Sequence, residues 1–258
     1  MTHFVLCIGD PHFQEKNMSD SQILVQKILE LIAKNNFEFV VVLGDLLHTM
    51  ETFKMFPYNL AITFLKKISK LVPLYFIVGN HERIGPDDFQ TENHPYIALD
   101  DYKNIKIVSK AEYITINNKN YFFVPYVPNG KFFEALLTTS ANEGELLERF
   151  KTTTAIFGHQ EFRGCQTGAV KSTKGDIWPL NYPLVISGHI HTYEALQTNI
   201  LYTGTPQQIG FDDSCDKTVS QFIFSNVGKF EHKRIDLEIT KKKIIKIDFS
   251  KFTRGRTI

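Results

Sequence analysis

The chain has 258 residues, and its 29 Lys and Arg nearly balance its 28 Asp and Glu, giving a formal net charge of +1. This balance argues against a globally basic nucleic-acid binder and against an acidic disordered chain. No apolar run reaches the about 18 residues of a membrane span, and the first residues predict a strand rather than a signal peptide. Three widely spaced cysteines suit a reducing compartment. We therefore expect a cytoplasmic or nuclear protein, with a phage or viral source as an alternative.

The first half of the chain alternates between predicted strands and helices. Apolar runs at 4–8, 39–43 and 74–78 predict buried strands, each followed by a glycine and a polar residue. Helices are expected between them, at about 20–35 and 53–71. Four aliphatic residues are expected on the buried face of the first helix: Ile23, Ile28, Leu31 and Ile32. This alternation indicates a parallel sheet with crossover helices.

The second half is richer in predicted strands. The candidates are 105–108, 113–116, 121–124, 154–157, 184–187, 201–203, 219–224, 230–237 and 243–249. Residues 117–120 predict a hairpin turn, and 132–150 predicts a helix that is interrupted near 140–144. No segment has the composition of a linker, which favours a single domain.

The last 30 residues differ in charge from the rest of the chain. Residues 229–258 hold ten Lys and Arg against four Asp and Glu. One interpretation is an edge strand kept soluble by lysine, and the other is a basic strip that follows phosphates.

Five short polar motifs follow predicted strands, where ligand sites of open α/β sheets lie. They are Gly9–His12, Gly44–His48, Gly79–Glu82, Gly158–His159 and Gly188–His191. Six of the nine histidines fall in these motifs, beside Asp and Asn. Imidazole and oxygen donors without a thiolate suit divalent ions such as Mn, Fe or Zn. Two ions held close together need an anionic bridge, and Asp45 in the central motif is the candidate.

The ordered set D-x-H, G-D-x-x-H, G-N-H-E, G-H and G-H-x-H resembles the calcineurin-like metallophosphoesterase superfamily across residues 9–191. The segment Tyr202–Phe211 resembles the Y-x-G-S/T-P-x-Q-x-x-F signature of one branch, the SbcD-like DNA repair exonucleases of the meiotic recombination eleven type. Phe123–Pro128 is similar to the central strand of that branch. The resemblance implies a four-layer α-β-β-α sandwich with mixed sheets in a single domain. Its catalytic core would span 1–225, with a basic C-terminal β extension at 226–258 packed on it.

The resemblance also implies a role for each motif residue. The first metal would be held by Asp10, His12, Asp45 and His191, and the second by Asp45, Asn80, His159 and His189. A hydroxide would attack the phosphorus in line, with His81 beside the leaving oxygen as general acid or transition-state stabiliser. His48 would orient His81 or touch the phosphate, unless it is a structural histidine. Mn is the expected metal, with Mg, Fe, Zn and Ni as alternatives.

Three features leave alternatives open. Arg83 could bind a substrate phosphate or pair with Glu82 or Asp87. Trp178 could stack on a base or serve as a packing anchor. Only 67 residues follow His191, so we expect the family's DNA-capping domain to be absent or reduced to the basic tail.

The leading hypothesis is a two-metal phosphodiesterase that acts as a DNA exonuclease or endonuclease in repair, recombination or replication. The expected partners are DNA, an SbcC-like SMC-type ATPase and a second copy of the chain, and no membrane. The near-neutral net charge keeps open a phosphatase or phosphodiesterase acting on nucleotides, small phosphoesters or phosphoproteins. A non-catalytic scaffold ranks third, because all seven ligand positions are present.

Overall fold

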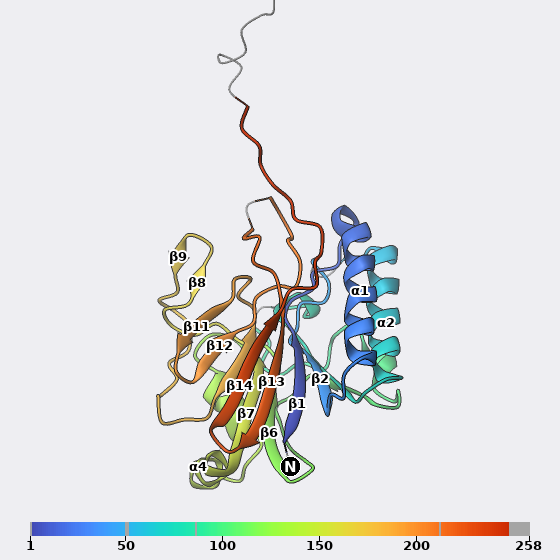
Figure 1. Ribbon diagram of the computed structural model, residues 1–258. Helices are drawn as coiled ribbons and strands as arrows, with labels where there is room; N and C mark the ends of the chain where they lie inside the picture. Colours follow the sequence, from blue (N-terminus) through green and yellow to red (C-terminus); the bar gives the residue numbers. More distant parts are fainter. Residues whose placement is uncertain (1, 50–51, 86, 212, 248–258) are drawn as a thin grey trace, which may run out of the picture.

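Two six-stranded mixed sheets lie face to face in the computed structural model, which describes residues 2–49, 52–85, 87–211 and 213–247 (Figure 1). The first sheet has the order β14-β13-β1-β2-β3-β4. Its strands are β1 (His3–Ile8), β2 (Phe39–Val42), β3 (Leu74–Ile77), β4 (Ile105–Val108), β13 (Val219–Asn226) and β14 (Lys229–Ile235). β1 to β4 are parallel, and β13 and β14 close the sheet as antiparallel strands.

The second sheet has the order β11-β12-β10-β7-β6-β5, and β6, β7, β10 and β12 are its parallel strands. Its strands are β5 (Glu112–Ile116), β6 (Lys119–Val124), β7 (Thr153–His159), β10 (Val185–Gly188), β11 (Glu194–Gln197) and β12 (Ile200–Tyr202). A small separate hairpin joins β8 (Gln166–Thr167) to β9 (Val170–Lys171).

Helices cover the outer face of each sheet. α1 (Met18–Ala33) and α2 (Met55–Ser69) cover the first sheet, and α3 (Phe132–Leu137) and α4 (Glu143–Thr152) cover the second. Three short 3-10 helices lie in connections: η1 (Glu15–Asn17), η2 (Asn80–Glu82) and η3 (Ile97–Leu99). None of the described helices is long and apolar enough to cross a membrane.

Strand β1 shows why the sandwich has four layers. Val5 and Cys7 point between the sheets, where they meet residues such as Phe157 of the second sheet. Leu6 and Ile8 point the other way, into the core under α1 and α2. Both faces of the strand are buried, which explains its continuous apolar sequence. The predicted α-β-β-α sandwich is confirmed.

Several local predictions need correction. The first helix begins at Met18, and it leaves Ile23 41% exposed because Leu24 and Val25 occupy its buried face instead. The predicted interruption near 140–144 separates α3 from α4. Residues 243–247 of the predicted strand 243–249 form no strand, and 248–249 lie outside the described residues. The division at residue 225 stays a prediction.

The core between the sheets depends on Phe39, which is fully buried and makes edge contacts with Tyr121, Phe123 and Phe157. Phe39→Ala should lower the free energy of unfolding by about 3–5 kcal/mol, because it leaves a cavity between the sheets. Phe4→Ala is the matched control, since Phe4 is 40% exposed. Chemical denaturation measures both, and equal losses would contradict this account of the core.

Candidate metal centre

The five predicted motifs meet at the carboxyl ends of parallel strands from both sheets. β1, β2 and β3 deliver the motifs of Asp10, Asp45 and Asn80 from the first sheet. β7 and β10 deliver His159 and His189 from the second. Parallel strands end at one edge, and the face-to-face packing brings the two edges together.

The side chains form three groups whose donor atoms lie within 4.8 Å of one another. These groups are Asp10, His12 and His191; His12, Asp45 and His81; and Asp45, His159 and His189. Asn80 joins the third group, since its Oδ1 lies 2.9 Å from both His159 Nε2 and His189 Nδ1. All seven predicted ligand residues are therefore brought together.

The donor set fits divalent metal ions. The Nε2 atoms of His12 and His191 lie 3.0 Å apart, and Asp10 Oδ1 is buried with no hydrogen-bond partner among the described residues. Convergent imidazole, carboxylate and amide oxygen donors are those that borderline divalent ions prefer. The His159 Nδ1–H donates to the carbonyl of Leu43 at 2.6 Å, which turns its Nε2 toward the centre.

Three glycines leave room for the ligands. A Cβ at Gly79 would lie 2.3 Å from Asp45 Oδ1, and one at Gly188 would lie 2.4 Å from Asp10 Oδ1. A Cβ at Gly44 would meet the His159 ring at 2.3 Å. These three positions therefore need glycine because ligand atoms approach the backbone so closely.

Burial and charge set the protonation of the centre. Burial raises the pKa of Asp10 to about 8. Burial acts in the same direction on Asp45, but the neighbouring histidines, His159 foremost, hold its pKa well below its usual value. Burial lowers the pKa of His189 to about 4, so this imidazole is neutral at pH 7 and can offer a lone pair. Burial also lowers the pKa of His159, but Asp45 and Asp10 outweigh it and raise the value to about 9.

Glu82 is a positioning residue that the sequence reasoning missed. Its buried carboxylate accepts hydrogen bonds from the amides of Asp45, Leu46, Leu47 and Gly79 at 2.8 to 3.3 Å. It thereby ties the loop after β2 to the loop after β3. The only available signal was its place next to His81, where the resemblance leads one to expect Asp.

His81 is held by the backbone of the His48 loop. The Nδ1–H of His81 donates to the His48 carbonyl at 2.6 Å, and His81 Nε2 lies 3.7 Å from Asp45 Oδ2. His81 is 20% exposed, whereas His12 and His159, which also lie near Asp45, are fully buried. Position 48 thus orients His81 through its carbonyl oxygen rather than through its imidazole.

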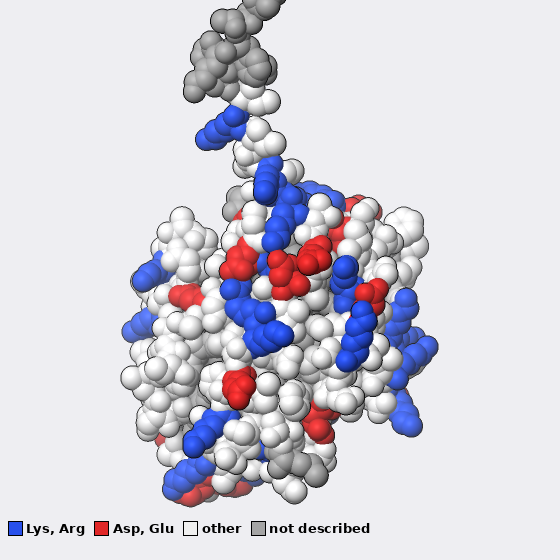
Figure 2. All heavy atoms as spheres, in the orientation of Figure 1, with Lys and Arg blue, Asp and Glu red and all other residues white. Residues whose placement is uncertain are grey.

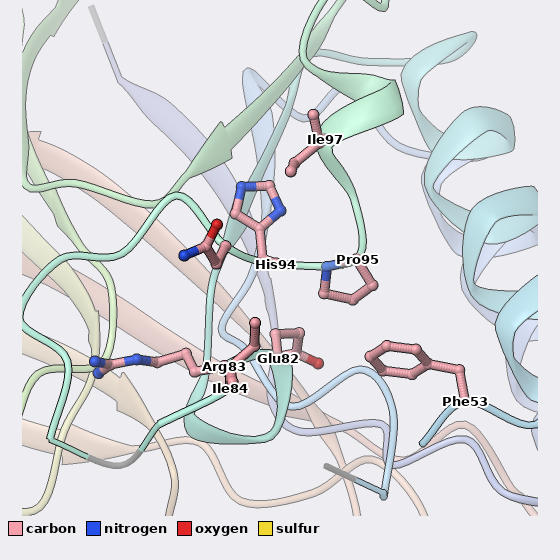
Figure 3. A pocket seen from close by; sticks show the side chains of 8 residues that line it. Phe53, Glu82, Arg83, Ile84, His94, Pro95 and Ile97 are labelled. Carbon is pink, nitrogen blue, oxygen red and sulfur yellow. The ribbon is translucent and has the colours of Figure 1, made fainter. Parts of the chain in front are cut away.

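Arg83 pairs with neither Glu82 nor Asp87 among the described residues. Its guanidinium donates to the carbonyl of Tyr126 at 2.8 Å and lies over the Tyr126 ring, which faces His189. Arg83 also lines a cavity of about 530 Å³, and Figure 3 shows its side chain extending away from Phe53, which lies on the other side. This cavity is lined by Phe53, Glu82, Arg83, Ile84, Asn93, His94, Pro95 and Ile97. None of the predicted metal ligands lines it.

Of the two interpretations left open for Trp178, its surroundings match the packing anchor. Its indole is 5% exposed, donates to the carbonyl of Pro183 and packs against Phe132 and Phe150. Trp178 is therefore a packing anchor between α3, α4 and the second sheet, as the alternative interpretation had it.

The segment Tyr202–Phe211 forms hydrogen bonds to the backbone of the ligand loops. The amide of Thr205 donates to the His191 carbonyl, and Gln207 Nε2 donates to the Pro11 carbonyl between two ligand residues. Buried Lys217 donates to the same His191 carbonyl and to Thr205 Oγ1, a contact that no sequence pattern indicated.

A polar groove of about 650 Å³ opens at the centre. It is lined by Gln166, Thr167, Gly168, Ala169, His189, Ile190, His191, Thr192, Asp213 and Ser214. The β8–β9 hairpin supplies one wall, and the two histidines place the groove next to the candidate ligands. A substrate could therefore reach the centre along this groove.

Glu82→Gln should lower the free energy of unfolding by about 1–3 kcal/mol, because the new amide group turns a donor toward backbone N–H groups. It should also lower the metal content, since Asp45 loses its support. Glu92→Gln is the control, because Glu92 pairs with Lys110 at the surface and should lose less than about 1 kcal/mol. Denaturation and metal analysis test both variants, and equal stabilities would refute the role of Glu82.

Comparisons with known proteins agree with this geometry. The family model described as calcineurin-like phosphoesterase matches residues 5–193. The chain is 39% identical over 251 residues to "Putative phosphoesterase 078R" of Invertebrate iridescent virus 3, covering 97% of this chain and 71% of that protein. It is 37% identical over 253 residues to "Putative phosphoesterase 244L" of Invertebrate iridescent virus 6, covering 96% and 87%.

Among solved structures, the fold is similar to the purple acid phosphatase PPD1 of yellow lupin, with a TM-score of 0.53 and 12% identity. The match covers 94% of this chain and 54% of the phosphatase. At this identity the likeness extends to the fold alone. On the family match and the two viral relatives together, the chain belongs to the calcineurin-like phosphoesterase family.

Proposed function

We propose that this protein is a two-metal phosphodiesterase that cleaves DNA in the manner of the SbcD-like nucleases. The observation that carries the proposal is the convergence of seven candidate ligands and His81 beside an open polar groove. The resemblance of Tyr202–Phe211 to the SbcD-like signature supports the choice of DNA. The two viral relatives favour the alternative of a phage or viral source, although their names state no substrate.

The proposed ligand sets divide around Asp45. Asp10, His12 and His191 would hold one ion and Asn80, His159 and His189 the other, with Asp45 shared between them. A pair of divalent ions, Mn being favoured, would supply positive charge for the phosphoryl oxygens and an acidified water. His81 would hold a proton at Nε2 and give it to the leaving oxygen, since its Nδ1–H is engaged by the His48 carbonyl.

Arg83 would add a cation beside the centre. Its Nε and Nη2 are buried and have no hydrogen-bond partner among the described residues, and the residue as a whole is only 3% exposed. A substrate phosphate would satisfy these donors, which makes Arg83 a proposed phosphate contact. The SbcC-like ATPase and the second copy of the chain stay predictions.

A specific observation favours the second candidate, a phosphatase or phosphodiesterase for small substrates. No Lys or Arg is among the described residues that line the groove, and its one carboxylate among them, Asp213, is paired with Lys217 at 3.9 Å. Such a wall offers little attraction to a long phosphate backbone.

Hydrolysis assays separate the two candidates. With Mn²⁺, the protein should cleave labelled single- or double-stranded DNA as well as bis(p-nitrophenyl) phosphate. The cleavage of DNA should fall steeply with salt concentration. Hydrolysis of small esters together with intact DNA would favour the second candidate. No hydrolysis by a protein that binds two ions per chain would refute both.

His81→Ala should lower kcat by about 10²–10⁴, because the leaving oxygen loses its proton donor, while the metal content stays the same. His48→Ala should lose much less, since the carbonyl that orients His81 is retained. Turnover kinetics and metal analysis measure both. Loss of metal from His81→Ala would identify His81 as a ligand, and equal losses of kcat would assign chemistry to the His48 imidazole.

A further inference from the structure

A lysine-rich segment leaves the body of the protein at the end that carries the candidate metal centre. We call Lys241–Ile247 the basic arm, since it holds four lysines and no acidic residue. It forms neither helix nor strand, and Ile244, Ile245 and Ile247 are 57% to 80% exposed. Figure 1 shows it rising beside α1, and Figure 2 shows lysine side chains along it.

The root of the arm is firmly attached. Leu237 and Ile239 are buried in the core under α1 and α2. Gln208 then clamps the backbone of Lys242: its Oε1 accepts the Lys242 amide at 2.6 Å, and its Nε2 donates to the Lys242 carbonyl at 3.3 Å. The Lys242 ammonium lies 3.7 Å from Asp20 at the start of α1. The arm therefore departs from a fixed point.

That fixed point lies at the rim of the metal centre. Gln207, the neighbour of Gln208, donates to the carbonyl of Pro11, which stands between the proposed ligands Asp10 and His12. Gln208 Nε2 also donates to the carbonyl of Asp213, which lines the groove together with His189 and His191. One pair of glutamines thus connects the arm to both the ligand loop and the groove.

The charges of the arm are divided between its root and its outer part. Lys241 pairs with Asp236 and Lys242 with Asp20, so these two lysines serve the attachment. Lys243 and Lys246 are exposed, and no carboxylate of the described residues lies within ion-pair distance of them. The described residues that line the neighbouring groove include no Lys or Arg. Lys243 and Lys246 therefore offer positive charge to a polyanion beside it.

We propose that the basic arm binds the phosphate backbone of a DNA strand and holds that strand at the metal centre, an inference that rests on the proposed nuclease function. The lysines supply the attraction that the groove wall lacks, and the exposed isoleucines offer apolar contact to the bases. The arm would thereby favour polymeric over small substrates at the same centre.

The test compares two doubly substituted proteins with the same change of charge. Lys243→Gln/Lys246→Gln removes the outer cations of the arm. Lys34→Gln/Lys103→Gln is the control, because these exposed lysines precede β2 and β4, at the opposite end of the strands. Affinity for a phosphorothioate oligonucleotide with Mn²⁺ is measured by fluorescence polarisation over a range of salt concentrations. The ratio of kcat/KM for DNA to that for bis(p-nitrophenyl) phosphate is measured alongside.

The arm variant should bind about tenfold more weakly in about 0.1 M salt, with a salt slope reduced by about 1.4 for two lost phosphate contacts. Its kcat/KM ratio should fall in proportion, and the control should match the wild type. If both variants lose the same affinity for the oligonucleotide, or if neither loses any, the role of the arm is overturned and the nuclease function still stands. A wild-type protein that hydrolyses the small diester without binding the oligonucleotide would overturn both. If the oligonucleotide binds through the arm but no ester is hydrolysed, the proposed function alone fails.

Discussion

The position of one carboxylate, that of Asp45, determines how the centre is arranged. It lies 3.4 to 3.8 Å from nitrogen atoms of His12, His81 and His159, and it belongs to two of the three candidate metal groups. A buried carboxylate is costly unless positive charge surrounds it. Among the neighbouring side chains, His159 does most to lower the pKa of Asp45, and bound cations would act in the same direction. Glu82 fixes the loop from which Asp45 projects.

The two sheets have to pack closely for this arrangement to exist. Asp10 and Asp45 come from the first sheet, whereas His159 and His189 come from the second. The aromatic core between the sheets therefore determines the distance between donor atoms that are far apart in sequence. A single carbon atom added at Gly188 of the second sheet would lie 2.4 Å from Asp10 Oδ1 of the first, so little space is left between the two edges.

The meeting of the motif residues could be predicted because each motif follows an apolar run that has only one reasonable interpretation, a buried parallel strand. Their assignment as metal ligands came from the family resemblance and stays a prediction. The role of Glu82 could not be predicted, because its partners are backbone amides, and no pattern of side chains in the sequence reveals them. The isoleucine-rich run at 243–247, with its two lysines, resembles a strand in sequence. A strand also needs a neighbouring edge to pair with, and sequence does not reveal whether one is available. Trp178 was ambiguous because its aromatic neighbours come from α3 and α4, which only the fold brings next to it.

Three of the proposed ligands adopt a left-handed backbone conformation, with φ of 46° at His12, 47° at Asp45 and 78° at His189. This conformation is unfavourable for most residues but is well tolerated by asparagine. For protein engineering, the choice of replacement at these positions therefore decides whether the loops survive. Asparagine would weaken a ligand and keep the backbone relaxed, whereas valine or isoleucine would add strain to the loss of a donor. A folded but inactive protein, suited to trapping a bound substrate, is best sought through asparagine at these three sites.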